Sequence, residues 1–316
     1  MSIRPNVVPF ASRAGGDDRT AWLAHLRDAM PAHRIAPVNE LAEGERAAAR
    51  VAIVADPDPA DLAALPNLVW VQSLWAGVER LVAELPPAIG IARLVDPNLA
   101  RVMAEAALAW TLALHRDMPR YARQQREHVW RAHEYRPPED VTVGVLGLGA
   151  LGRASASILA RHGYRVLGWS RSAKAIEGVE THEGARGLGA VLAASDVLVL
   201  LVPLTDGTRG LLGADELGAI KPGAALVNFA RGPVVDDAAL LAALDEGRLS
   251  HAVLDVFDTE PLPPGSPFWD HPRVTVLPHV SAPTTKASAA RIAADAIAAF
   301  ERDGGTPPLV DRGRGY

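Results

Sequence analysis

The sequence contains no cysteine, which excludes disulfide bonds and thiolate chemistry. No stretch approaches the roughly 20 apolar residues that a membrane helix needs. The longest apolar runs, such as DVLVLLVP at 196–203, are only of strand length and end in proline. The first residues also lack the apolar core of a signal peptide. We therefore expect a soluble, cytoplasmic protein with no membrane partner.

Positive charge is also scarce. The 32 Lys and Arg residues are outnumbered by 37 Asp and Glu residues, which gives a net charge of −5, and no long basic run occurs. Nucleic acids and anionic membranes are bound largely through clustered positive charge, so the sequence favours neither as a partner. No metal site is expected. The 316 residues, 49% of them hydrophobic, are enough for one large or two ordinary domains.

Apolar runs of strand length alternate with helix-like stretches such as 20–30, which is typical of α/β proteins with parallel sheets. In the first hundred residues the expected strands are 6–10, 51–55, 68–73 and 92–95. Residues 98–131 then read as a long helical stretch that Pro119 kinks or breaks. The alternation restarts with expected strands at 141–149, 165–169, 197–202, 225–229, 251–255 and 274–277.

A last helix, expected at 284–303, follows the final strand and has no later strand to join. We expect it to return to the first unit, which makes that unit discontinuous. The predicted domains are residues 1–98 with 284–316, and residues 99–283.

The strand expected at 141–149 ends in a GxGxxG sequence, Gly147-Leu-Gly149-Ala150-Leu151-Gly152. In a dinucleotide-binding turn the first glycine allows the tight turn, the second lets the backbone approach a pyrophosphate, and the third lets helix and strand pack closely. The following helix offers free N–H groups to the phosphates. A glycine-rich turn made for packing alone is the alternative. The strand before, the helix after and a second strand soon afterwards favour the nucleotide site.

The second strand of this unit ends in Ser170-Arg171-Ser172, with Lys174 close by. An NAD site usually has an Asp or Glu here, which binds the adenosine ribose and repels a 2′-phosphate. A serine hydroxyl can donate to phosphate, and arginine can contact two phosphate oxygens at once. The pattern predicts a preference for NADP(H), with NAD(H) as a possible second cofactor. The alternative is a solvated loop in which Arg171 binds nothing.

Three polar side chains follow the last three strands. Arg231 follows one strand, Glu260 the next, and His279 the last. Open α/β sheets bind ligands at these carboxyl ends. Reduction of a 2-oxo acid needs such a set: a histidine to protonate the carbonyl oxygen, a carboxylate to stabilise the imidazolium, and an arginine to bind and polarise the substrate. Each residue alone also fits a structural role.

The sequences NFARGPVVDDAALLAAL, LDVFDTEPLPPGSPFW and LPHVSAPT resemble the catalytic half of the D-isomer-specific 2-hydroxyacid dehydrogenases. The resemblance covers nearly the whole chain. SLWAGVERL at 73–81 and the closing DRGRGY resemble, more narrowly, the glyoxylate/hydroxypyruvate reductase A subgroup. The resemblance implies a Rossmann nucleotide-binding domain and a flavodoxin-like substrate domain. It also implies reduction of glyoxylate to glycolate and of hydroxypyruvate to D-glycerate. The family usually has an acid where this sequence has Ser170, and this departure favours NADPH as the cofactor.

Residue roles follow from the same resemblance. Arg231 is expected to bind and polarise the substrate, Glu260 to pair with the histidine, and His279 to act as acid–base. The backbone N–H groups of Trp75-Ala76-Gly77 are expected to bind the substrate carboxylate, in agreement with the anion-binding character of such turns. The resemblance also implies that Pro203 and its neighbour Leu204 flank the cofactor, and that Asp255 lies near it.

Several alternatives stay open. One alternative is a dehydrogenase that acts on a different, larger 2-oxo acid. Another is a non-catalytic protein that senses NAD(P). Trp75 and Trp269 either narrow the substrate pocket or belong to the core. The arm at 123–135, with Trp130, resembles the region through which these enzymes form homodimers, but Trp130 also fits a core anchor. The tail with Arg312 and Arg314 either packs near the site or is frayed.

Overall fold

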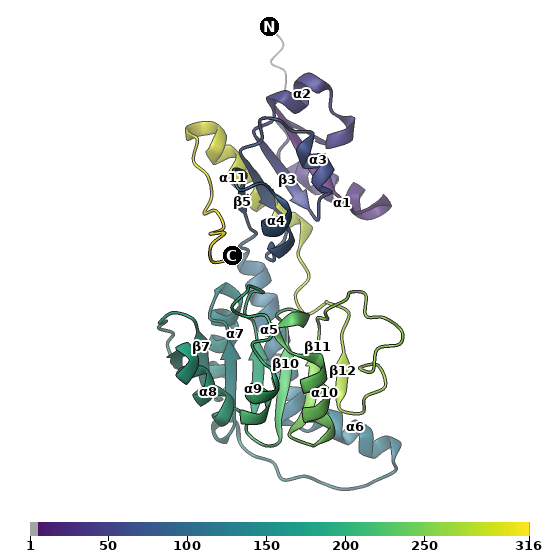
Figure 1. The fold of residues 1–316 in the computed structure, drawn as a ribbon, viewed down its shortest axis with the longest axis vertical. Helices are drawn as coiled ribbons and strands as arrows, with labels where there is room; N and C mark the ends of the chain where they lie inside the picture. Colours follow the sequence, from purple (N-terminus) through teal and green to yellow (C-terminus); the bar gives the residue numbers. More distant parts are fainter. Residues whose placement is uncertain (1–5, 316) are drawn as a thin grey trace. The chain divides into compact units, whose positions relative to one another are not determined.

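The computed structural model describes residues 6–315. The chain divides into two compact units, one formed by the residues up to Asn98 together with those from Thr284 onward, the other by Leu99–Pro283. Figure 1 shows that each unit has its own sheet with helices packed beside it. Among the described residues, no helix is both long and apolar enough to cross a bilayer.

The first unit contains a five-stranded sheet in the order β2-β1-β3-β4-β5, with every pairing parallel. This is the flavodoxin-like doubly wound order. Its strands are β1 (Asn6–Ser12), β2 (His33–Pro37), β3 (Val51–Ala55), β4 (Trp70–Ser73) and β5 (Gly90–Ala92). Its helices are α1 (Gly16–Ala29), η1 (Val38–Glu40), α2 (Glu43–Ala48), α3 (Pro59–Ala63), α4 (Glu79–Glu84) and α11 (Lys286–Asp303).

Helix α11 completes the core of the first unit although it lies almost 200 residues further along the chain than β5. Its buried face consists of Ala289, Ala290, Ala293 and Ile297. These small side chains let the helix lie close to α1 and the sheet, where they join Trp22 and Trp70 in one cluster. At the other end of α11, the Phe300 ring meets Trp70 edge to face.

The second unit contains a seven-stranded sheet in the order β12-β11-β10-β9-β6-β7-β8, again parallel throughout. Counted within the unit, this is the Rossmann order 3-2-1-4-5-6 with one strand added. Its strands are β6 (Thr142–Leu146), β7 (Arg165–Ser170), β8 (Val179–Glu183), β9 (Val197–Leu200), β10 (Ala224–Asn228), β11 (Leu249–Leu254) and β12 (Val274–Val276). The predicted fold class, two doubly wound parallel-sheet domains, is confirmed.

The helices of the second unit cover its sheet (Figure 1). They are α5 (Pro97–His115), which begins at the boundary with the first unit, α6 (Met118–Arg126), η2 (Pro138–Asp140), α7 (Ala150–Arg161), α8 (Gly184–Ala194), α9 (Ala214–Ala219), η3 (Gly232–Val234) and α10 (Asp237–Asp245). Strand β6 is buried along its whole length, as a strand covered on both faces must be. The order of the strands reverses between β6 and β9, which is where such sheets bind ligands.

Some element predictions were wrong. Strands β2 and β8 were not expected, and the strand predicted at 92–95 lies at Gly90–Ala92 instead. Strand β8 escapes prediction because it forms the sheet edge and is only partly buried, so it needs no apolar run. The helical stretch predicted at 98–131 is broken near Pro119 as expected, into α5 and α6, but α6 ends at Arg126, before the predicted limit. The backbone of Asp117 is left-handed (φ 55°), and Pro119 stands in the first turn of α6, where a missing N–H is tolerated.

His251 in β11 makes folding depend on pH. The side chain is 6% exposed, and its Nε2 lies 2.9 Å from Thr275 Oγ1. Burial, followed by the charges of Arg123 and His271, lowers the pKa of His251 to about 4. The His251 imidazole is therefore protonated below about pH 6.5 in the unfolded chain, but only below about pH 4 in the folded chain. The free energy of unfolding is therefore highest above pH 6.5, where His251 is neutral in both states, and it falls as the pH drops from 6.5 to 4.

We expect this residue alone to remove on the order of 3 kcal/mol of stability between pH 6.5 and pH 4. Urea unfolding at a series of pH values measures the effect. His251→Gln removes the titrating group, so its stability should depend less steeply on pH across this window. The exposed His162→Gln should keep the wild-type slope. Parallel curves for wild type and His251→Gln would contradict the assignment.

Candidate active site

The glycine turn after β6 has the geometry of a dinucleotide site. Gly147 has a φ of 102°, and a Cβ there would lie 2.6 Å from the carbonyl carbon of Leu201. A Cβ on Gly152 would overlap the carbonyl oxygen of Gly147. By contrast, a Cβ on Gly149 would meet no described atom within 4 Å apart from those of its immediate neighbours in the chain. Packing therefore requires glycine at positions 147 and 152, whereas Gly149 leaves the backbone open to a ligand.

The first turn of α7 supplies the donors. Gly149 is the N-cap residue and has no side chain to cap the helix, so Ala150 and Leu151 begin the helix with amides that no N-cap side chain satisfies. A helix N-terminus of this kind is a ready site for phosphate. The residues present therefore fit the pyrophosphate of a dinucleotide.

The loop after β7 is held by side chains that donate to its carbonyl oxygens. Ser170 Oγ donates to the Ser172 carbonyl at 2.6 Å. From α7, Arg153 Nη1 donates to Ala175 at 3.0 Å, and from β8, Thr181 Oγ1 donates to Lys174 at 2.6 Å. The hydroxyl proton of Ser170 is thus used within the loop. Ser170 shapes this loop, while Arg171 and Ser172 stand in the exposed segment that follows β7.

The loop after β10 carries Arg231 and is shaped by the buried Asn228. Asn228 Oδ1 accepts from the Ala230 amide at 3.1 Å, and its Nδ2 donates to the Arg231 carbonyl at 3.1 Å. A Cβ on Gly232 would overlap the peptide that joins Phe257 and Asp258. The loop that carries Arg231 therefore packs directly on the loop that leads to Glu260.

Glu260 and His279 form a hydrogen-bonded pair. His279 Nδ1 lies 2.8 Å from Glu260 Oε2, and the other carboxylate oxygen accepts from the Phe257 amide at 2.9 Å. Both side chains remain open to solvent, at 52% and 36% exposure. Since Nδ1 faces the carboxylate, Nε2 on the opposite edge of the ring is left for proton transfer.

Asp255 fixes the segment that carries His279. The carboxylate is 3% exposed, and its two oxygens accept from the amides of Val280 at 2.7 Å and Ser281 at 2.9 Å. His279 has a φ of 53°, a left-handed conformation that non-glycine residues seldom adopt. Such strain persists where neighbouring contacts over-determine it, and it is concentrated at functional sites. The predicted contact of Asp255 with the cofactor stays a prediction.

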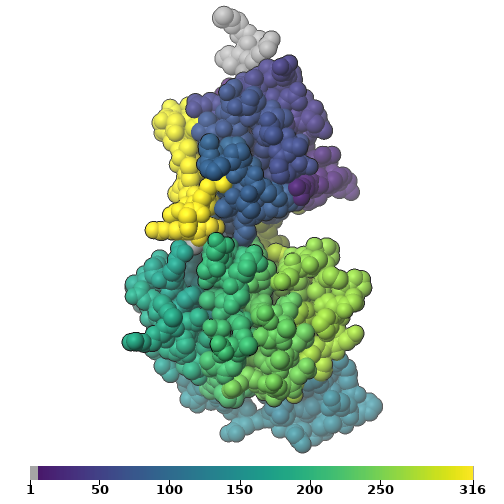
Figure 2. All heavy atoms as spheres, viewed as in Figure 1, coloured from purple at the N-terminus to yellow at the C-terminus, as the bar shows by residue number. Residues whose placement is uncertain are grey.

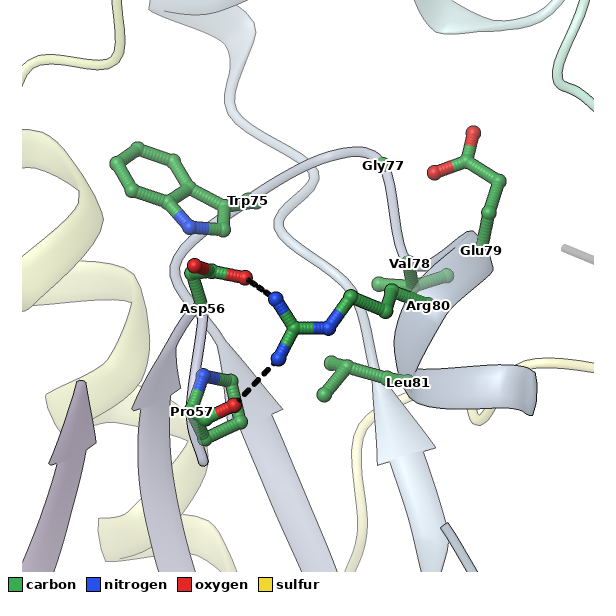
Figure 3. A pocket seen from close by; sticks show the side chains of 8 residues that line it. All are labelled: Asp56, Pro57, Trp75, Gly77, Val78, Glu79, Arg80 and Leu81. Carbon is green, nitrogen blue, oxygen red and sulfur yellow. Dashed lines mark hydrogen bonds and ion pairs between the residues drawn. The ribbon is translucent and has the colours of Figure 1, made fainter. Parts of the chain in front are cut away.

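In the first unit, the loop after β4 carries Trp75, Ala76 and Gly77. The Trp75 amide donates to Ser73 Oγ at 3.0 Å, and the same hydroxyl donates to the Trp75 carbonyl at 3.1 Å. The Trp75 amide is thus already used, which leaves those of Ala76 and Gly77 as the candidate anion donors. Figure 3 shows this loop running into α4, beside a pocket that Arg80 also lines.

The tryptophans differ in their surroundings. The Trp75 ring meets Trp22 edge to face at 5.6 Å and packs against the core of the first unit. Trp130 is fully exposed and Trp269 is half exposed, so the alternative that these two belong to the core is wrong. Whether Trp75 or Trp269 also limits the substrate stays a prediction. So does the cofactor contact of Pro203, which lies three residues beyond the end of β9 and whose carbonyl accepts from Thr208.

Sequence reasoning missed several residues that build these loops: Ser73, Arg153, Thr181 and Asn228. Only Asn228 carried a signal, as a polar residue at the end of a buried strand. The others act through backbone carbonyls or amides that no spacing in the sequence reveals.

Comparison with known proteins agrees with this geometry. The sequence model described as "D-isomer specific 2-hydroxyacid dehydrogenase, NAD binding domain" matches residues 108–281. The chain is 38% identical over 303 residues to glyoxylate/hydroxypyruvate reductase A of Serratia proteamaculans (strain 568), covering 93% of this chain and 96% of that protein. This chain belongs to the D-isomer-specific 2-hydroxyacid dehydrogenase family. The resemblance read from the sequence is confirmed, and the protein is an oxidoreductase.

Two solved structures are close in fold. A D-isomer specific 2-hydroxyacid dehydrogenase from Xanthobacter autotrophicus Py2, in complex with NADPH and MES, is 40% identical with a TM-score of 0.92 and covers 99% of this chain and 100% of that one. An NADPH-dependent glyoxylate/hydroxypyruvate reductase from Sinorhizobium meliloti, in complex with NADP and sulfate, is 34% identical with a TM-score of 0.87 and covers 98% and 100%.

Proposed function

We propose that this protein reduces small 2-oxo acids, glyoxylate and hydroxypyruvate among them, with NADPH. The observation that carries the proposal is the 2.8 Å pair of His279 and Glu260, because the loop that leads to Glu260 is the one against which the Arg231 loop packs. An acid, its carboxylate partner and a substrate-binding cation are then grouped at the carboxyl edge of one sheet. The names of the relatives from Serratia and Sinorhizobium support the choice of substrates.

Each residue has a role in this reaction. When bound, NADPH supplies the hydride to the carbonyl carbon. His279, protonated, donates from Nε2 to the carbonyl oxygen as negative charge develops there. Glu260 accepts a hydrogen bond from Nδ1 and stabilises the imidazolium, while the Phe257 amide keeps the carboxylate in place. Arg231 polarises the carbonyl and binds the substrate carboxylate. In the first unit, the amides of Ala76 and Gly77 are donors suited to a substrate carboxylate.

The preference for NADPH is assigned to Arg171 and to the loop around it. No carboxylate stands at the end of β7 to repel a 2′-phosphate, because the position is Ser170. With the carbonyls of Ser172, Lys174 and Ala175 already accepting protein donors, the loop is pre-formed before a phosphate arrives. The NADPH and NADP complexes of the two structural relatives support this assignment.

We also propose that the protein is a homodimer formed through the arm that follows α6. This part of the chain exposes Val129 at 44%, Trp130 at 103% and Tyr135 at 55%. Large apolar side chains gathered in one exposed segment mark interaction surfaces. A second copy of the chain would cover them.

The cofactor prediction is tested with initial rates on glyoxylate and hydroxypyruvate, using NADPH and NADH in parallel. We expect NADPH to be strongly preferred. Arg171→Ala should raise the KM for NADPH roughly 10- to 100-fold, the effect of losing a charge-assisted contact of about 1.5–3 kcal/mol, and should change the KM for NADH little. Arg161→Ala, at the end of α7 remote from the glycine turn, makes the same charge change and should leave the KM for NADPH unchanged. Faster turnover with NADH by the wild type would contradict the assignment.

The acid–base prediction concerns His279 and Glu260. We expect His279→Ala to lower kcat about 10²- to 10⁴-fold, the usual contribution of a general acid. Glu260→Gln should also lower kcat, because an amide has one acceptor oxygen where the structure uses two. Fluorescence titration with NADPH should give wild-type affinity for both variants. The exposed Glu246→Gln serves as control, and undiminished turnover by His279→Ala would overturn the mechanism.

The oligomer prediction is tested by light scattering on a sizing column. We expect a mass twice the 33.4 kDa of the chain. Trp130→Asp should shift the equilibrium toward monomer, because it places a charge where an apolar ring would be covered. Trp269→Asp, which changes another exposed tryptophan, should leave the mass unchanged. A monomeric wild type at micromolar concentration would refute the dimer.

A further inference from the structure

The C-terminal tail of the first unit is attached to the sheet edge. After α11 ends, Leu309 forms a single antiparallel bridge with Ala92, and the Val310 amide donates to the Ile91 carbonyl at 2.8 Å. The Leu309 side chain lies over Gly90, where an added Cβ would come within 2.9 Å of it. Figure 2 shows the yellow C-terminal segment lying against the blue part of this unit. The alternative that the tail is frayed is therefore wrong for residues 309–315, and Tyr316 lies outside the described residues.

Arg312 is the central residue of this attachment. Its Nη1 donates to the carbonyls of Val82 at 3.1 Å and Leu85 at 2.9 Å. Its Nη2 donates to those of Pro86 and Ile89, both at 2.9 Å. The last carbonyls of a helix have no partner within the helix, and here one guanidinium satisfies those at the end of α4 and in the turn beyond it. Only arginine offers several donors in a rigid plane with this reach.

Helix α4 links Arg312 to the loop that carries Ala76 and Gly77. The helix begins at Glu79, two residues after Gly77, and the Val82 amide donates to the Val78 carbonyl at 2.9 Å. The carbonyl of the same Val82 accepts from Arg312. One helical turn therefore separates the guanidinium from the loop.

The other end of α4 is held as well, by Arg80. This side chain pairs with Asp56, donates to the Pro57 carbonyl at 2.7 Å and contacts Glu84 at 2.9 Å, so it joins the helix to the segment after β3 (Figure 3). The first turn of α4 is thus tied to the sheet and its last turn to the tail. The short helix cannot rotate or slide without breaking one of these two sets of bonds.

We propose that Arg312 is a positioning residue for substrate binding: by clamping the end of α4, it fixes the Ala76 and Gly77 amides that hold the substrate carboxylate. The inference rests on the proposed function. Two amides must converge on one carboxylate, and misplacement by about 1 Å costs up to 10²-fold. Arg312 does not contact the substrate itself, so its removal should change binding of the 2-oxo acid and not the chemical step or binding of NADPH.

The experiment compares Arg312→Ala and Arg312→Lys with Arg314→Ala. Arg314 lies two residues further on, pairs with Asp311 at 3.1 Å and carries the same charge, which makes Arg314→Ala a matched control. We expect Arg312→Ala to raise the KM for glyoxylate and hydroxypyruvate roughly 10- to 100-fold, with kcat at saturation and the KM for NADPH unchanged. Arg312→Lys, with fewer donors, should give an intermediate KM and keeps the test available if the alanine variant does not fold.

Amide hydrogen exchange without substrate supplies the second readout. Peptides that span residues 76–85 should exchange faster in Arg312→Ala than in Arg314→Ala, while peptides from β6 and α7 stay unchanged. A wild-type KM in Arg312→Ala, or equal exchange in both variants, would overturn the positioning role and leave the proposed function standing. A loss of kcat with unchanged KM would also overturn it. Absence of 2-oxo acid reduction by the wild type itself would overturn the proposed function, and this role with it.

Discussion

The carboxylate of Asp255 determines where His279 stands. It is buried, and both of its oxygens are bonded to successive amides of the segment that follows β12. A free chain would not keep His279 at a φ of 53°, because the left-handed region is costly for a residue with a Cβ. The hydrogen bonds from the Val280 and Ser281 amides to Asp255 hold the two residues that follow His279, so the imidazole ring lies 2.8 Å from Glu260. Without this anchor, the imidazole and the carboxylate would have no fixed relation.

A second constraint places Arg231 next to this pair. Strands β10 and β11 are neighbours in a parallel sheet, so the loops at their carboxyl ends start side by side. Gly232 then removes the one atom that would keep them apart, since its Cβ would occupy the Phe257–Asp258 peptide. The arginine precedes this glycine and Glu260 follows that peptide. Sheet order and one missing methyl group thus bring the loop that carries Arg231 against the loop that leads to Glu260.

The fold class and the pairing of Glu260 with His279 could be predicted from the sequence because they depend on patterns that occur within short stretches. Buried parallel strands read as apolar runs, the glycine turn has a fixed spacing, and Arg231, Glu260 and His279 each follow such a run. Strand β8 could not be predicted, because an edge strand made of Val-Glu-Thr-His-Glu buries too little to need apolar residues. The attachment of Arg312 to α4 was equally hidden. It joins residues about 230 positions apart, and the carbonyls it binds have no signature in the sequence.

The two revised residues, Ser170 and Trp75, show why side-chain chemistry alone is an incomplete guide to ligand contacts. A serine next to an arginine at the end of β7 suggests a phosphate donor, yet the proton of Ser170 goes to the Ser172 carbonyl. The Trp75 amide stands in a turn predicted to bind an anion, yet it donates to Ser73. In both places the protein uses a donor to shape its own loop. In the proposed function, neighbouring groups then bind the ligand: Arg171 in one loop, and the Ala76 and Gly77 amides in the other. A loop that has to hold an anion must first satisfy its own carbonyls, because only a rigid loop aims its remaining donors at one point. Arg312 extends the same principle from the loop to the helix that follows it.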